Sequence, residues 1–243
     1  MHNKNMKRLV LIVAIFFSLL FSGSAMAQQT IITVPSSDVL PGGEIILKES
    51  TRFSPWHEGF VSLTPSIIMG TGKDTETSFG VGTTLDDTTK VKLDIASKKV
   101  FRVGKASRFT IGGRVSPTLT DSVMPDNFLY AHGSYLIKET KTTITSGVYV
   151  MGKTHLPDKT GALIGIDQTI IPNKLRIVAD WMSRNDTGSA LSAGFKIRPS
   201  PKTSITTAVM IPNSNEDRLA FSISISQYMG DIFNIIKKEK ENL

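Results

Sequence analysis

One segment of the chain alternates strictly between apolar and small residues, and this pattern constrains the fold more than any other feature. Between residues 218 and 228, alanine and serine alternate with the apolar side chains of Leu219, Phe221, Ile223 and Ile225. In an extended strand, this period of two places the apolar residues on one face and the small residues on the other. The same alternation recurs, less regularly, back to about residue 44. The pattern therefore predicts β-sheet with one apolar and one polar face.

The first 27 residues have the features of an export signal. A basic start at Lys4, Lys7 and Arg8 precedes an apolar run from Leu9 to Phe21, and Ala25-Met26-Ala27 supplies the small residues that signal peptidase requires. We therefore expect residues 1–27 to be a cleaved signal peptide. An uncleaved membrane anchor is the alternative.

Composition excludes several classes of protein. The chain has no cysteine, which rules out a lipoprotein, a disulfide framework and Cys-based zinc or iron–sulfur sites. The net charge of +7 includes the basic residues of the signal peptide, and the remaining excess is spread along the chain, unlike a nucleic-acid-binding patch. No apolar run after residue 27 approaches the roughly 20 residues of a spanning helix. If the mature protein crosses a membrane, it must do so as strands.

Alternating segments separated by turn residues predict twelve strands. Each is close to the roughly 9–11 residues with which a tilted strand crosses the hydrocarbon layer. The separators are rich in Gly, Pro, Asn and Asp, as in Pro172-Asn173. The predicted strands span residues 44–52, 58–69, 77–85, 89–98, 106–118, 127–138, 142–151, 161–171, 174–183, 188–198, 203–211 and 218–228. The predicted fold is all-β, a single closed antiparallel up-and-down transmembrane β-barrel of about 12 strands, with 10 or 14 strands as alternatives.

Two segments of different character flank the predicted barrel, which covers residues 44–228. Residues 28–43 are expected to form an N-terminal periplasmic segment, and residues 229–243 a C-terminal amphipathic tail. Outer-membrane barrels join their strands by tight periplasmic turns and longer outer loops. The second half of the chain follows this rule. In the first half, Gly70 to Glu76 is expected to be a longer inner connection and Asp86-Asp87 a tight outer one.

Ionisable side chains are expected on the lumen face, because apolar residues of the same strands occupy the opposite face. A charge on the lipid face near the midplane costs roughly 2–4 kcal/mol for Arg or Lys, which supports this assignment. The predicted lumen-lining residues are Lys90, Lys92, Asp94, Arg108, Arg114, His132, Asp167, Arg176, Asp180 and Lys196. Two interpretations are open. Either the basic surplus lines a narrow, anion-leaning pore, or the charges pair into a network that fills a small barrel and stabilises it.

One pair of residues is similar to a known catalytic arrangement. His132 and Ser134 share one face of a strand, where an imidazole could activate a hydroxyl. The His-Gly-Ser sequence resembles the His-x-Ser pair of the outer-membrane phospholipase, which is also a twelve-strand barrel. The continuation of that motif is missing here, and the enzyme's pair faces lipid, whereas His132 and Ser134 are expected to face the lumen. We therefore expect a lumen histidine in a polar network and no enzyme activity.

Metal and cofactor sites are not indicated by the sequence. His57 and His155 lie in predicted loops and have no second ligand at the spacing of a metal site. Gly80-Val81-Gly82 does not follow the strand–helix pattern of a dinucleotide loop. We expect no metal and no cofactor.

Most of the mature chain resembles small Gram-negative outer-membrane barrels that are described as porin-like. The resemblance is carried by the stretch from Ala179 to Gly194, by Met210-Ile211-Pro212-Asn213 and by the segment from Val39 to Ile46. It implies a place in the outer membrane, contact with outer-membrane lipid, and folding with the help of the barrel-assembly machinery. Small solutes are potential partners, and the oligomeric state is open.

The function expected from these features is a small passive, anion-leaning pore or a structural envelope protein. Two alternatives belong to other classes. One is a lipid-modifying hydrolase that uses His132 and Ser134, and the other is a soluble periplasmic β-sheet binding protein.

Overall fold

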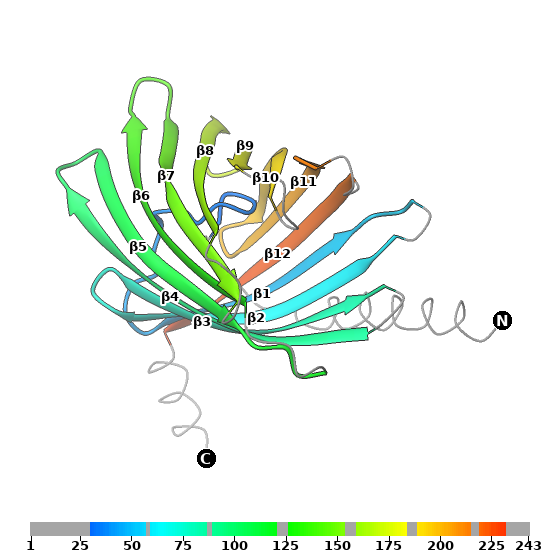
Figure 1. Ribbon diagram of the computed structural model, residues 1–243. Coiled ribbons are helices and arrows are strands. Elements are labelled where there is room, and N and C mark those ends of the chain that lie inside the picture. Colours follow the sequence, from blue (N-terminus) through cyan, green and yellow to red (C-terminus); the bar gives the residue numbers. More distant parts are fainter. Residues whose placement is uncertain are drawn as a thin grey trace, which may run out of the picture.

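Twelve strands form one closed antiparallel barrel, which confirms the predicted fold class and strand number. The computed structural model describes residues 30–56, 59–86, 89–120, 126–153, 159–183, 189–214 and 219–231. Each strand pairs with its neighbours in the chain, and the last strand pairs with the first to close the barrel (Figure 1). The predicted signal peptide and most of the predicted tail lie outside the described residues.

The strands follow one another without an intervening helix in the described part of the chain. They are β1 (Glu44–Phe53), β2 (Val61–Gly72), β3 (Thr75–Leu85), β4 (Thr89–Val103), β5 (Ser107–Ser116), β6 (Asp126–Ile137), β7 (Thr142–Lys153), β8 (Lys159–Ile171), β9 (Leu175–Met182), β10 (Ala190–Ser200), β11 (Thr203–Pro212) and β12 (Ala220–Asp231). Strand β12 extends to Asp231, which pairs with Glu44 of β1, and so reaches beyond the predicted end of the barrel at residue 228.

All connections at one end of the barrel are tight turns, and this end also carries the start of β1 and the end of β12. We call it the turn end, and the opposite end the loop end. Asp74, Lys141 and Asn173 adopt positive φ angles of 58°, 54° and 59° in three of these turns. Asp and Asn tolerate this left-handed conformation better than most residues, which explains their place in the turns. The Arg102 guanidinium, hydrogen-bonded to the Asp74 carboxylate, holds the pKa of that carboxyl below its usual range.

The expected longer inner connection between Gly70 and Glu76 is wrong. Strand β2 continues to Gly72 and β3 begins at Thr75, so that only Lys73 and Asp74 form the turn. The ladder includes the pairs Gly70 with Glu76 and Gly72 with Thr75, with a register shift between them. The glycines and polar residues of this stretch looked like a loop, although they are the ends of two paired strands. With this correction, the first half of the barrel also has tight turns at the turn end.

The outer surface of the barrel is apolar on strands β2 to β12. Exposed large apolar side chains include Ile67, Phe79, Ile95, Phe109, Leu129, Val148, Ile166, Ile177, Phe195, Val209 and Ile223. Soluble monomers rarely expose a contiguous apolar patch of more than a few hundred Å². A closed antiparallel barrel with an apolar outside is the architecture of outer-membrane barrels.

Within the described ranges, no helix has the length and apolar character that crossing a membrane requires.

An arginine at the centre of the apolar surface is expected to destabilise the barrel. Ile166 lies in the middle of β8 and is exposed on the outer face. In Ile166→Arg we expect the free energy of unfolding in lipid vesicles, measured by urea titration, to fall by about 2–4 kcal/mol. Leu119→Arg is the control, because Leu119 is exposed in the β5–β6 connection at the loop end, where the cost is about 0–1 kcal/mol. Equal effects of the two substitutions would contradict the placement of β8 in lipid.

Candidate functional site: the filled lumen and its basic mouth

Residues 30–43 lie inside the barrel. Figure 1 shows this segment, in blue, running through the space that the strands enclose. It contacts β9 at Ile32, β5 and β6 at Ser37, and β3 at Leu40 before it enters β1. The sequence predicts an N-terminal periplasmic segment over residues 28–43 and gives no indication of a path through the lumen. We call residues 30–43 the lumen segment.

The lumen segment is buried although it belongs to no strand. The exposed fractions of its buried side chains are 3% for Ile31, 0% for Val34, 5% for Ser36 and Ser37, and 7% for Leu40. A side chain that faced a water-filled channel would be exposed on at least one side. The packing also uses a close approach to the wall, because a Cβ atom at Gly165 would lie 2.2 Å from Ile31 Cδ1. The lumen is therefore filled at the level of these residues.

Asp180 of β9 binds one end of the lumen segment with four hydrogen bonds. Its Oδ2 accepts the backbone N–H groups of Ile32, Thr33 and Val34 at 2.7, 2.7 and 2.8 Å, and its Oδ1 accepts the Thr33 hydroxyl at 2.8 Å. Asp180 is 2% exposed. Consecutive N–H groups that converge on one anion form a nest, and such charge-assisted bonds are stronger than neutral ones. Alternation predicted that Asp180 faces the lumen, but not that it holds another part of the chain.

A hydroxyl chain and an ion pair bind the middle of the lumen segment. Ser37 Oγ lies 2.9 Å from Thr110 Oγ1 and 2.7 Å from Ser134 Oγ. Arg108 Nη1 donates to the Asp38 carboxylate at 2.9 Å and to the Ser37 carbonyl at 3.2 Å. These contacts tie the segment to β5 and β6, in addition to its attachment to β9.

A buried ion pair on β3 and β4 supports the last part of the lumen segment. Lys98 Nζ lies 3.2 Å from Glu76 Oε1, and their side chains are 5% and 1% exposed. Lys98 also donates to the carbonyl groups of Ser36 and Asp38, at 3.0 and 2.5 Å, and Glu76 accepts the N–H of Leu40 at 3.1 Å. Both charges thus have additional hydrogen bonds, which a buried pair needs to offset its desolvation.

Removing one partner of this pair is expected to cost more than removing both. In Glu76→Ala, the Lys98 ammonium stays buried without its counter-ion, and we expect the free energy of unfolding to fall by about 3–5 kcal/mol. The double variant Glu76→Leu with Lys98→Met removes both charges and is expected to lose less than Glu76→Ala alone. Urea titration of the three proteins in the same detergent measures the difference. A double variant that loses as much stability as Glu76→Ala, or more, would contradict the coupling of the two side chains.

An apolar cluster fills the part of the lumen near the Asp180 attachment. Ile31 and Val34 of the lumen segment pack with inward side chains of β6, β7, β8 and β9, namely Phe128, Tyr149, Leu163, Val178 and Met182. Phe128 also contacts Tyr130 and Tyr149, with ring centroids 5.4 and 5.5 Å apart. The sequence predicts a polar lumen, and this cluster is the main departure from that prediction. It gives the lumen segment an apolar surface against which to pack.

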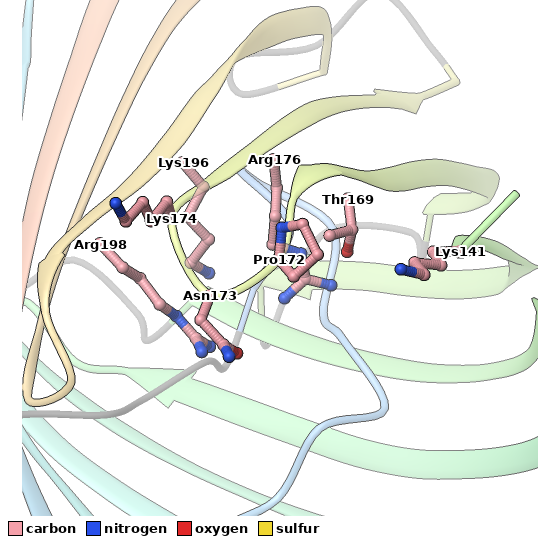
Figure 2. Close-up of a pocket in the computed structure, with 8 residues that line it drawn as sticks. All are labelled: Lys141, Thr169, Pro172, Asn173, Lys174, Arg176, Lys196 and Arg198. Atoms are coloured by element: carbon pink, nitrogen blue, oxygen red, sulfur yellow. The ribbon is translucent and has the colours of Figure 1, made fainter.

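The turn end of the lumen holds a basic cavity. Its volume is about 400 Å³, and its lining includes Lys141, Asn173, Lys174, Arg176, Lys196 and Arg198. Figure 2 shows Arg176, Lys196 and Arg198 reaching toward Asn173 of the β8–β9 turn. Arg176 is paired with Asp167 at 2.6 Å. The lining therefore carries more positive than negative charge.

The predicted lumen-lining residues occupy several separate environments. Asp180 and Arg108 contact the lumen segment, Arg176 and Lys196 line the basic cavity, and Asp167 pairs with Arg176. Asp94 accepts a hydrogen bond from Ser116 and lies 3.9 Å from Arg114. Arg114 also stacks over the Phe128 ring at 5.6 Å. Lys90 forms an ion pair with Asp86 at 3.2 Å toward the loop end. The backbone of Lys92 forms an isolated β-bridge with Thr118. The ten side chains thus do not form one ring around a pore.

His132 and Ser134 do not form a nucleophile–base pair in this structure. The Ser134 hydroxyl bonds to Ser37 and Thr145, at 2.7 and 2.8 Å. His132 is 1% exposed and stacks on Tyr130, and neither ring nitrogen has a hydrogen-bond partner among the described residues. Both side chains are buried in the lumen, and each is engaged by neighbours other than its supposed partner.

Within the described ranges, no group of three or more His, Cys, Asp or Glu side chains is placed to hold a metal ion.

Four residues that contact the lumen segment or line the basic cavity are not among those predicted from the sequence. Glu76 was placed in a loop, Lys98 and Arg198 lay at the predicted ends of their strands, and Lys48 of β1 was not assigned to a face. Lys48 Nζ donates to Thr30 Oγ1 at 3.3 Å and so contacts the lumen segment. Two of these positions could have been found by extending the alternation further along each strand. Lys98 lies four residues after the inward Asp94 on β4, and Arg198 lies two residues after the inward Lys196 on β10.

Comparisons with known proteins return only structural similarity. No protein-family model and no curated protein matches the chain. Among solved structures, the chain is similar to the translocator domain of autotransporter NalP from Neisseria meningitidis, with 12% identity over 79% of this chain and 90% of that chain, and a TM-score of 0.48. It is also similar to the Acinetobacter baumannii outer membrane protein Omp33, with 8% identity over 76% and 99% of the two chains and a TM-score of 0.44. A mutant of Rh. blastica porin gives 5% identity over 76% and 98%, with a TM-score of 0.35. All three TM-scores lie below 0.5. The barrel fold is shown by the pairing of its own twelve strands.

Proposed function

We propose that this chain is an outer-membrane barrel that acts as a structural envelope protein, with its lumen closed by its own N-terminal segment. The burial of Ile31, Val34 and Ser37 inside the barrel is the observation that carries the proposal. The apolar outer face supports contact with membrane lipid. It favours this location over that of a soluble periplasmic protein, which would have to cover such a surface.

Planar-bilayer recording of the purified protein tests the closed state. We expect no discrete current steps from the full mature chain at moderate voltage, because the lumen segment and the apolar cluster fill the barrel interior. Steady open-channel current from the wild type would overturn the proposal. Incorporation is checked separately by flotation of protein-containing vesicles on a density gradient.

A second candidate is an anion-leaning pore that conducts only when the lumen segment withdraws. The basic cavity at the turn end favours this candidate, because rings of basic side chains select anions. It differs from the first proposal in one respect, the mobility of residues 30–43. A lipid-modifying hydrolase has less support, since the Ser134 hydroxyl is bonded to Ser37 and Thr145.

A further inference from the structure

The basic cavity contains a buried ammonium group without a counter-ion among the described residues, and this indicates a site for an anionic ligand. Lys196 of β10 is 3% exposed and lines the cavity. It forms no hydrogen bond or ion pair with any residue in the described part of the chain. An isolated buried charge costs several kcal/mol, and proteins normally pair such a charge or bind an ion to it.

The charges around Lys196 do not neutralise it. The charged groups that act on it electrostatically include Arg176 and Lys48, which repel it, and Asp167 and Asp38, which attract it. Each acid is already paired, Asp167 with Arg176 at 2.6 Å and Asp38 with Arg108 at 2.9 Å. The Lys196 ammonium therefore has no carboxylate of its own, and the other charged side chains that line the cavity are basic.

Arg198 adds a second unsatisfied donor to the same wall. It lies two residues beyond Lys196 on β10, so both side chains face inward. The Nε atom of Arg198 is buried and has no hydrogen-bond partner among the described residues. Figure 2 shows its guanidinium directed into the cavity beside Asn173. Lys141 and Lys174 contribute further positive charge at the cavity lining.

We propose that the basic cavity is a binding site for a phosphate group. A phosphate offers several acceptor oxygens and up to two negative charges, which suit an ammonium and a guanidinium on one wall. The cavity of about 400 Å³ is larger than a single phosphate ion, so the ligand is a phosphate ester whose remaining part occupies the space toward the turn end. The same chemistry is present in a soluble phosphomonoester and in a phospholipid headgroup. Phosphate binding in this cavity does not depend on whether the lumen conducts.

Calorimetric titration of the refolded mature chain in a maltoside detergent at low salt tests the site. The probes are inorganic phosphate and glycerol 3-phosphate, with acetate as the comparison anion. We expect both phosphates to bind, acetate to bind at least about tenfold more weakly, and Lys196→Met to weaken phosphate binding by at least about tenfold. Lys90→Met is the matched control, because it removes the same charge near the loop end, and its affinity is expected to equal that of the wild type.

A parallel experiment distinguishes the two sources of phosphate. The wild type and Lys196→Met are placed in nanodiscs with and without phosphatidylglycerol, and the thermal midpoint of unfolding is measured. A Lys196-dependent rise with phosphatidylglycerol, without binding of the soluble probes, identifies a lipid headgroup as the ligand. Binding of the soluble probes alone identifies a soluble phosphate ester.

Folding of the variants is verified by circular dichroism, and Arg198→Met provides a second variant should Lys196→Met fail to refold. Three results would overturn the proposal. These are equal binding of acetate and phosphate, equal loss of affinity in Lys196→Met and Lys90→Met, and the absence of any phosphate effect in detergent and in nanodiscs.

Discussion

Asp180→Ala is expected to destabilise the protein by about 3–5 kcal/mol and to release the first part of the lumen segment. Asp180 accepts four hydrogen bonds from Ile32, Thr33 and Val34. Without the carboxylate, three backbone N–H groups lose their acceptor in a buried site, and each unsatisfied buried donor costs about 1–3 kcal/mol. Water that reaches the released segment satisfies part of these donors, so the total loss of stability stays below the sum of the three individual costs. Urea titration in detergent, followed by tryptophan fluorescence, measures the change.

The control for this variant is another inward aspartate that does not contact the lumen segment. Asp94 lies on β4, bonds to Ser116 and is 3.9 Å from Arg114. Because its side chain is only partly buried, Asp94→Ala is expected to cost about 1 kcal/mol or less. Proteinase K digestion with mass spectrometry then reports release directly, as cleavage within residues 30–43 in Asp180→Ala only. Unchanged stability and equal protection in both variants would show that Asp180 does not anchor the segment.

The barrel itself could be predicted from the sequence because its signal is local. Alternation with a period of two fixes the face of each residue from its immediate neighbours, and Phe195, Lys196 and Ile197 illustrate this in β10. Phe195 and Ile197 are exposed outside and Lys196 is buried inside, as expected. Turn residues such as Asn173 mark the ends of strands in the same local way.

The filling of the lumen could not be predicted because its contacts are distant in the sequence. Asp180 binds residues that precede it by 146 to 148 positions, and the lumen segment has no periodic pattern that indicates a partner. A weaker signal was present in β6, where Phe128 and Tyr130 face inward while Leu129 faces outward. Bulky side chains on both faces of a strand indicate that the inner face is also packed against something.

Deletion of residues 30–40 is expected to turn a non-conducting barrel into a pore with anion preference. The deletion keeps Pro41-Gly42-Gly43 as the entry into β1, and it removes Ile31, Val34 and Leu40 from the lumen. Lys48, Lys98 and Arg108 then lose their contacts with the segment and face water. We expect discrete current steps and a reversal potential that shows anion preference in a gradient of potassium chloride near 0.1 M, where the Debye length is about 10 Å.

A reversible cross-link distinguishes a permanent seal from a segment that withdraws. The chain contains no cysteine, and the hydroxyls of Ser37 and Ser134 lie 2.7 Å apart, so Ser37→Cys with Ser134→Cys places two thiols at the site of that contact. If the seal is permanent, current is absent in oxidant and in reductant, and only the deletion variant conducts. If the segment withdraws, reductant produces current that oxidant abolishes, as expected for the second candidate function. A silent deletion variant would instead show that inward side chains alone close the barrel, because Tyr149, Leu163 and Met182 would still occupy the lumen after residues 30–40 are gone.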